Sequence, residues 1–166
     1  MKHLVAVPLL LLAVLLQSAL LSQMRFLSGS ADLLLVLLAA WSIHERVQSG
    51  WHWAFLVSVL TSFVTHLAWP AVFIGYFAVV LIAKLLSRRV WQAPLLAMFG
   101  VTAAGTLFMH LETFAILRIA GTPLPPGAVL GSVTLPSLML NILLAIPVLA
   151  WVRDFAAWTY PLPENA

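Results

Sequence analysis

The chain has no cysteine and very little charge. Cysteine is absent from all 166 residues, which excludes disulfide bonds and metal sites built on thiolates. Only 8% of the residues are Asp, Glu, Lys or Arg, whereas soluble domains carry about 25%. A chain so poor in charge, and 63% hydrophobic, lacks the polar surface that a soluble domain needs. The composition therefore indicates a protein that crosses a membrane several times.

The small positive charge is better explained by membrane orientation than by nucleic acid. The formal net charge is only +3, and the basic residues stand singly or in one short group formed by Lys84, Arg88 and Arg89. We expect this group to face the anionic head groups of the lipid bilayer; a cytoplasmic partner is the competing explanation. A nucleic-acid partner is not expected.

Apolar runs predict an all-α, polytopic membrane protein, a bundle of six transmembrane helices in a single domain over residues 1–166. The predicted spans cover about residues 4–21, 31–43, 51–68, 72–86, 91–119 and 133–153. The first run resembles a signal peptide, but it is long enough to span and further spans follow, so we interpret it as a retained helix. Trp69 and Pro70 are predicted to form a turn, and residues 120–132, with three prolines, a loop.

The distribution of basic residues predicts the topology. Six spans place both termini on one side of the membrane. That side would carry six basic residues, and the other side would carry two. Cytoplasmic loops carry the excess of Lys and Arg, so we expect both termini in the cytoplasm. The six are Lys2, Arg46, Lys84, Arg88, Arg89 and Arg153, and the two are Arg25 and Arg118.

The last predicted span carries two polar side chains on one face. Ser137 and Asn141 are four residues apart, so they lie one above the other on a helix. An unpaired amide in hydrocarbon is costly. We therefore expect Asn141 to point into the bundle and to hydrogen-bond a neighbouring helix. Pro147 falls later in this span and is expected to bend it.

Ionisable side chains gather in the outer half of the predicted bundle. Asp32 begins the second span, where a helix-capping role is the simplest interpretation. An ionisable group inside a span is a functional hypothesis, and His66, His110 and Glu112 qualify. The plainer alternatives are histidines satisfied by a neighbouring helix, and an overlong fifth span that carries Glu112 and Arg118 into water. No metal is expected, since zinc takes three or four convergent ligands and His110 and Glu112 lie about 200° apart around a helix.

Small residues recur along the fifth span, among them Gly100 and Ala104. Such spacing lets helix backbones approach closely. It serves either packing within the bundle or a docking groove for another protein's helix. No HExxH, GxSxG or P-loop motif occurs, so neither an enzyme nor a cofactor is predicted.

Three segments together resemble one family of membrane proteins. LLQSALLS, GSADLLLVLLAAWSIHERVQSGWHWAF and LPSLMLNILLAIPVLAWVRD are similar to the MreD family of rod-shape-determining proteins, and the resemblance covers nearly the whole chain. The best matches are the start of the second span, Ala31-Asp32-Leu33-Leu34, and the spaced set Pro136, Ser137, Asn141, Pro147 and Arg153. One departure is the third span, FLVSVLTSFVTHLAWP, which has no glycine and carries His66 roughly where many family members have an aspartate.

This resemblance implies a non-enzymatic subunit of the bacterial cell-elongation machinery, which maintains rod shape and lateral peptidoglycan synthesis. It implies a location in the inner membrane and an MreC-like partner with a single span. Through that partner the family associates with RodA, a class B penicillin-binding transpeptidase and cytoplasmic MreB filaments.

MreD proteins are also similar to the six-helix substrate-binding components of energy-coupling-factor vitamin transporters, which supplies the alternative function. Such a component should present convergent polar and aromatic groups under a lid. The predicted outer loops are short, apart from the uncharged, proline-rich residues 120–132, so the sequence favours the scaffold. A membrane enzyme is the third class of function, and the sequence lacks the acid and base groups that such an enzyme would need.

Overall fold

The computed structural model describes residues 2–21, 25–44, 49–65, 67–87, 93–123 and 125–159. The structure is mostly helical, at 87%. Within the described residues, three helical stretches could cross a membrane by length and composition. They are α4 (Trp69–Ser87), α5 (Pro94–Ile119) and the last stretch, which is apolar over Pro126–Ala157.

The other elements are shorter. Helix α1 (Lys2–Leu16) continues into a π-helical turn, η1 (Gln17–Leu21). A two-residue hairpin, β1 (Arg25–Phe26) and β2 (Gly29–Ser30), leads into α2 (Leu33–Ile43) and then α3 (Gly50–Val64). The last stretch consists of α6 (Pro126–Val129), a second π-helical turn η2 (Leu130–Thr134), and α7 (Leu135–Thr159).

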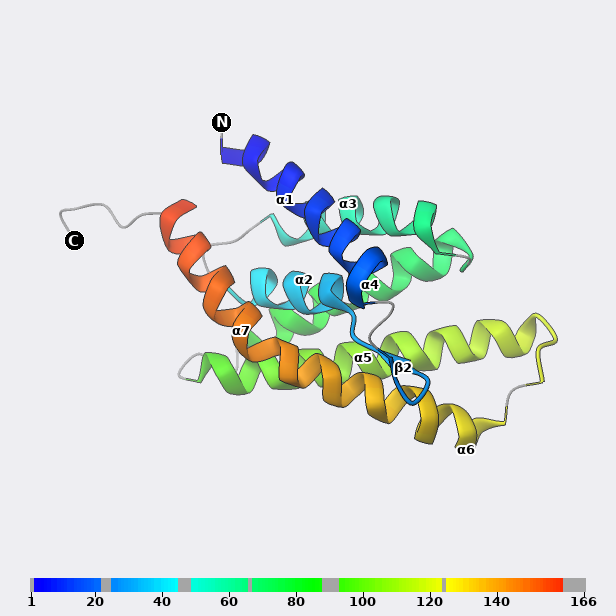
Figure 1. Cartoon of the computed structure of the whole chain (residues 1–166). Coiled ribbons are helices and arrows are strands. Elements are labelled where there is room, and N and C mark those ends of the chain that lie inside the picture. Colours follow the sequence, from blue (N-terminus) through cyan, green and yellow to red (C-terminus); the bar gives the residue numbers. More distant parts are fainter. Residues whose placement is uncertain are drawn as a thin grey trace.

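The helical stretches run back and forth between the same two ends of the molecule (Figure 1). At one end, on the left of Figure 1, α1 begins and α7 ends; we call it the terminal end. The hairpin, the end of α5 and the start of α6 lie toward the opposite end, which we call the hairpin end. This arrangement results when each apolar stretch folds back against the one before it.

Helix α2 forms the centre of the bundle. It is apolar all round, and Leu35, Val36 and Ala39 are fully buried. A helix that is hydrophobic on every side belongs in a core. Its neighbours α4, α5 and α7 pack around it.

The small residues of α5 serve packing within the bundle. A Cβ atom on Gly100 would lie 2.8 Å from Leu86 of α4, and one on Gly105 would lie 3.1 Å from Val79 of the same helix. Ala104, between them, is half-buried. This contact with α4 accounts for the small-residue face, so the packing alternative holds for Gly100 and Gly105.

Several predicted boundaries are wrong at positions next to proline. Trp69 and Pro70 are not a turn but the first residues of α4, because proline is well tolerated in a helix's first turn. Likewise, residues 126–132 are not a loop: Pro126 starts helix α6. Proline's fixed φ favours helix initiation, and a count of prolines does not reveal this role.

Other predicted boundaries differ by several residues. The predicted third span ran to residue 68, but α3 ends at Val64. The last helix extends past Arg153 to Thr159. The hairpin was not predicted at all, since two-residue strands carry no periodic signal.

Pro136 leaves one carbonyl of the π-helical turn before α7 without a helical donor. Proline has no N–H to donate to the carbonyl four residues earlier, which is that of Ser132. The backbone N–H of Ser28, in the hairpin, donates to this carbonyl instead at 3.0 Å. The carbonyl that lacks a helical donor thus holds the hairpin against the last helical stretch. Later in the same helix Pro147 lies inside α7, which changes direction along its length in Figure 1.

Candidate functional site

Asn141 lies at the centre of a buried hydrogen-bond network toward the hairpin end. Its side chain is 1% exposed. Its Oδ1 atom accepts a hydrogen bond from the backbone N–H of Asp32 at 2.7 Å, and its Nδ2 donates to the Thr106 hydroxyl of α5 at 2.9 Å. The expected hydrogen bond to a neighbouring helix is therefore present, and Asn141 joins α7, α5 and the start of α2.

Two further side chains hold the segment between the hairpin and α2. The Ser137 hydroxyl accepts from the backbone N–H of Ser30 at 3.1 Å. Gln17 of η1 donates to the carbonyl of Ala31 at 2.9 Å and accepts from the N–H of Leu33 at 2.7 Å. Non-helical backbone inside a bundle must find internal partners. These polar side chains supply them, which gives Gln17 a structural role just after the apolar helix α1.

Asp32 caps helix α2, as predicted. Its Oδ1 accepts from the backbone N–H of Leu35 at 2.9 Å. This is the N-cap arrangement, in which a carboxylate satisfies one of the free N–H groups of the first turn. The hydroxyl of Tyr76, on α4, lies beside the same carboxylate.

His110 and Glu112 face different neighbours. The Nδ1 atom of His110 lies 3.2 Å from the Thr134 hydroxyl of η2, so this histidine is satisfied by a neighbouring element. Glu112 turns toward α4, where a Cβ atom on Gly75 would lie 3.4 Å from its Oε2. Within the described residues, no three His, Cys, Asp or Glu side chains come together to hold a metal.

Glu112 is half-buried, so part of its side chain is shielded by the bundle. Its Oε1 atom is buried and has no hydrogen-bond partner among the described residues. Arg118, six residues further along α5, is exposed, and its guanidinium lies 5.8 Å from the centre of the Phe114 ring. His66 lies outside the described residues.

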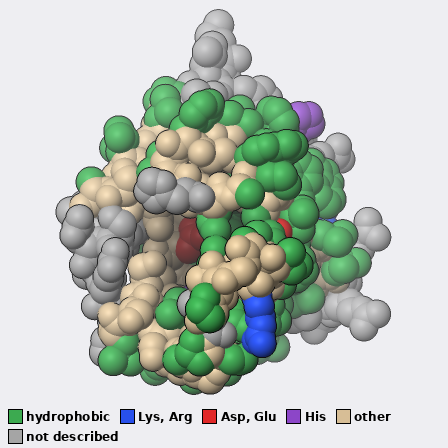
Figure 2. All heavy atoms as spheres, turned by 90° about the vertical axis from the view of Figure 1, so that its right-hand side faces the viewer, with side chains coloured by type: hydrophobic (Ala, Val, Ile, Leu, Met, Phe, Trp, Pro, Cys, Tyr) green, Lys and Arg blue, Asp and Glu red, His purple; other side chains and the backbone are tan. Residues whose placement is uncertain are grey.

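Asp32 and Glu112 both line a cavity of about 370 Å³ toward the hairpin end. We call it the outer cavity. Figure 2 looks onto this end and shows a hollow with an acidic side chain in its depth. The remaining polar groups of its wall include Gln17, Thr61 and Tyr76. The sequence indicated Asp32 and Glu112 as polar groups of the spans, but Thr61 and Tyr76 gave no signal.

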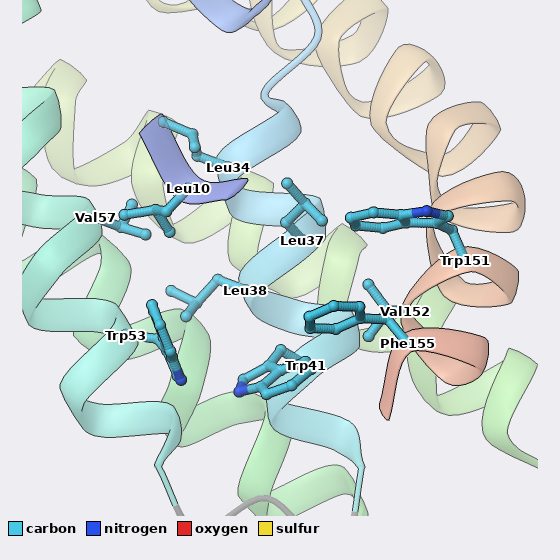
Figure 3. A pocket seen from close by; sticks show the side chains of 10 residues that line it. All are labelled: Leu10, Leu34, Leu37, Leu38, Trp41, Trp53, Val57, Trp151, Val152 and Phe155. Carbon is cyan, nitrogen blue, oxygen red and sulfur yellow. The ribbon is translucent and has the colours of Figure 1, made fainter. Parts of the chain in front are cut away.

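A second depression lies toward the terminal end and is apolar. We call it the apolar groove, and it has a volume of about 70 Å³. Figure 3 shows the side chains that line it, which come from α1, α2, α3 and α7: Leu10, Leu34, Leu37, Leu38, Trp41, Trp53, Val57, Trp151, Val152 and Phe155.

Aromatic contacts build one side of the apolar groove. Trp41 lies edge-on to Trp53 with ring centres 6.4 Å apart, and 5.9 Å from the ring of Phe155. Phe155 in turn stacks on Trp151 at 5.9 Å. These rings were not predicted as a site, because α7 is distant in sequence from α2 and α3.

Of the basic group expected at a membrane surface, Lys84 lies in the last turn of α4, a favourable place for a cation at a helix C-terminus. Arg88 and Arg89 lie outside the described residues.

Compared with models of protein families, with curated proteins and with solved structures, the chain shows no match.

Proposed function

We propose that the chain is a non-enzymatic membrane scaffold, a bundle of six spans with both termini in the cytoplasm. In this proposal it is a subunit of the cell-elongation machinery in a bacterial inner membrane, as the resemblance to MreD implies. The arrangement in Figure 1 supports it, since the helical stretches run between two common ends. Three of these stretches are long and apolar enough to cross a membrane.

The short helices fit a six-span bundle because of the hydrogen-bond network. Helix α2 has 11 residues, which extend about 16 Å, whereas the hydrocarbon core is about 30 Å thick. Irregular backbone is tolerated at membrane depth only where it is buried in protein or lines a water-filled cavity. Gln17, Ser137 and Asn141 provide such burial with hydrogen bonds at the start of α2.

The described positive charges agree with the proposed orientation. Lys84 lies in the last turn of α4, and Arg153 lies near the end of α7, both toward the terminal end. Arg118 lies at the end of α5, toward the hairpin end. An excess of basic residues at the terminal end supports a cytoplasmic position for that end.

The observation that carries the scaffold proposal is the apolar groove. Its wall is made of leucine, valine and aromatic side chains, and Trp151 at its edge is 44% exposed. Aromatic side chains are enriched where proteins bind one another. By contrast, the polar side chains of the network form hydrogen bonds with backbone groups, so they have a structural role and suggest no catalytic one. We infer that one or two large side chains of an MreC-like partner's single span fill the groove.

Affinity purification in a mild detergent, followed by identification of the co-purifying proteins, tests this proposal. The scaffold predicts recovery of a single-span MreC-like protein, with RodA and a class B penicillin-binding transpeptidase. A variant with Trp151→Ala should recover less of the partner than the control Leu143→Ala, since Leu143 is on the same helix, 69% exposed, and outside the groove. Equal recovery from both variants would argue against the groove as the contact.

The outer cavity favours a second candidate, a small-molecule-binding component of a metabolite transporter. Pockets for small molecules are about 300–1,000 Å³, and this cavity, of about 370 Å³, presents several polar groups and Tyr76. The same purification separates the two candidates. A pair of ATPases with a shared coupling subunit would replace the cell-wall proteins if the transporter candidate is right.

A further inference from the structure

The outer cavity combines two carboxylates with an otherwise mostly apolar wall. Asp32 comes from the start of α2 and Glu112 from α5, so two different helices direct acids to one space. Tyr76 and Thr61 add hydroxyl groups, while Leu34, Val72 and Met109 provide apolar surface. At about 370 Å³, the cavity has room for a small molecule and not only for a few waters.

The two acids differ in what they already do. Asp32 spends one carboxylate oxygen on the N–H of Leu35, as the cap of α2. Glu112 has no such structural role, because its Oε1 atom is buried without a hydrogen-bond partner among the described residues. Buried polar atoms in proteins almost always have a partner, and Glu112 lines the outer cavity, so a ligand in the cavity could satisfy its carboxylate.

The charge of the wall indicates the sign of that ligand. No lysine, arginine or histidine is among the described residues that line the outer cavity. A buried carboxylate is stable when a positive charge or several hydrogen-bond donors neutralise it. We propose that the outer cavity binds an ammonium group, with Glu112 as its principal partner and Asp32 and Tyr76 as further acceptors. This inference does not depend on the scaffold proposal, because the described linings of the outer cavity and the apolar groove share only Leu34, and both acids belong to the outer cavity.

The acceptors and apolar residues of the wall indicate the chemistry of the rest of the ligand. A primary ammonium has three donors, which match the acceptors of Glu112, Asp32 and Tyr76. The apolar residues would receive the carbon atoms next to the amine. Two sources carry this chemistry: a free organic amine from outside the cell, or the head group of phosphatidylethanolamine from the membrane itself.

Two measurements on the full-length protein distinguish these sources. For the free amine, the midpoint of thermal unfolding is followed in lipid-free detergent with benzylamine, and with benzyl alcohol as the neutral control. For the lipid, native mass spectrometry counts the lipids retained from vesicles of phosphatidylethanolamine and phosphatidylglycerol. Stabilisation by benzylamine alone supports a free amine, and selective retention of phosphatidylethanolamine supports the lipid.

Glu112→Gln is the main variant and should weaken the binding about tenfold or more, as expected for the loss of a charged hydrogen-bond partner. Asp154→Asn is the matched control, because Asp154 is an exposed acid at the terminal end. If Glu112→Gln does not fold, Thr113→Leu keeps both acids and narrows the cavity that Thr113 lines, so it should reduce binding as well.

The proposal is overturned if neither benzylamine nor phosphatidylethanolamine binds. It is also overturned if benzyl alcohol binds as well as the amine, if phosphatidylglycerol is retained equally, or if Glu112→Gln and Asp154→Asn behave alike. If the protein binds the amine but no MreC-like partner co-purifies with it, the scaffold proposal is contradicted and the amine proposal is not. The two proposals therefore fail separately.

Discussion

The side-chain oxygen of Asn141 accepts a hydrogen bond from the backbone N–H of Asp32 at 2.7 Å. The two residues are 109 positions apart, so this bond ties the last helix to the start of the second. The Asp32 side chain also caps α2. Asp32 therefore bonds to α7 through its backbone N–H and stabilises the start of α2 through its carboxylate. Packing at the hairpin end depends on this pair.

Replacement of Asn141 should therefore cost more than replacement of its side-chain partner. Asn141→Leu leaves the buried N–H of Asp32 without an acceptor, which costs about 1–3 kcal/mol. Thr106→Val removes one hydrogen bond of Asn141 and keeps the bond to Asp32, whereas Asn141→Leu removes both; interhelical bonds in membranes average about 0.6 kcal/mol each. Unfolding of both variants in mixed micelles measures the two costs. A larger loss for Thr106→Val would contradict the assigned roles.

Gly29→Ala should disrupt the contact between the hairpin and the last helix. The added Cβ would lie 2.7 Å from the backbone nitrogen of Ser137 and from the backbone oxygen of Val133. Backbone atoms cannot move aside easily, and overpacking typically costs about 1–3 kcal/mol. Gly127→Ala is the control, because nothing lies within 4 Å of its added Cβ. The thermal midpoint should fall for Gly29→Ala and stay unchanged for Gly127→Ala; equal midpoints would show that the hairpin is not held as described.

The topology can be tested with a reporter that is active only in the cytoplasm. Fused to the C-terminus, it should be active, because the side with six basic residues, Lys84 and Arg153 among them, is expected to remain inside. The same reporter inserted after Thr122, beyond the end of α5, should be inactive although the protein is stably expressed. The reverse pattern of activity would invert the proposed orientation.

The sequence was informative where one residue decides the local structure. Asp32 could be identified as a cap because a carboxylate before an apolar helix satisfies its first N–H groups. Asn141 could be expected to be buried because an amide in the middle of an apolar span has no other favourable position. In both cases the physical requirement comes from the residue and its immediate neighbours.

The partners of these residues could not be predicted, because they depend on long-range contacts. That Asn141 would bond Asp32 and Thr106, or that Ser28 would complete the carbonyl left free by Pro136, follows only from the packing of helices distant in sequence. The outer cavity and the apolar groove are assembled from four or more elements each, so no local pattern announces them. Glu112 shows the consequence: no local pattern indicated that its Oε1 is buried and that its Oε2 lies beside Gly75 of α4.

Site-specific photo-crosslinking tests the central claim, that the apolar groove binds a partner's membrane helix. A benzoylphenylalanine in place of Trp151, at the edge of the groove, is compared with the same residue in place of Leu143, which is exposed on α7 outside the groove. The scaffold account predicts a crosslink from position 151 to a single-span MreC-like protein and none from position 143. A crosslink from position 143 with none from position 151, in cells where the partner is present, would contradict it.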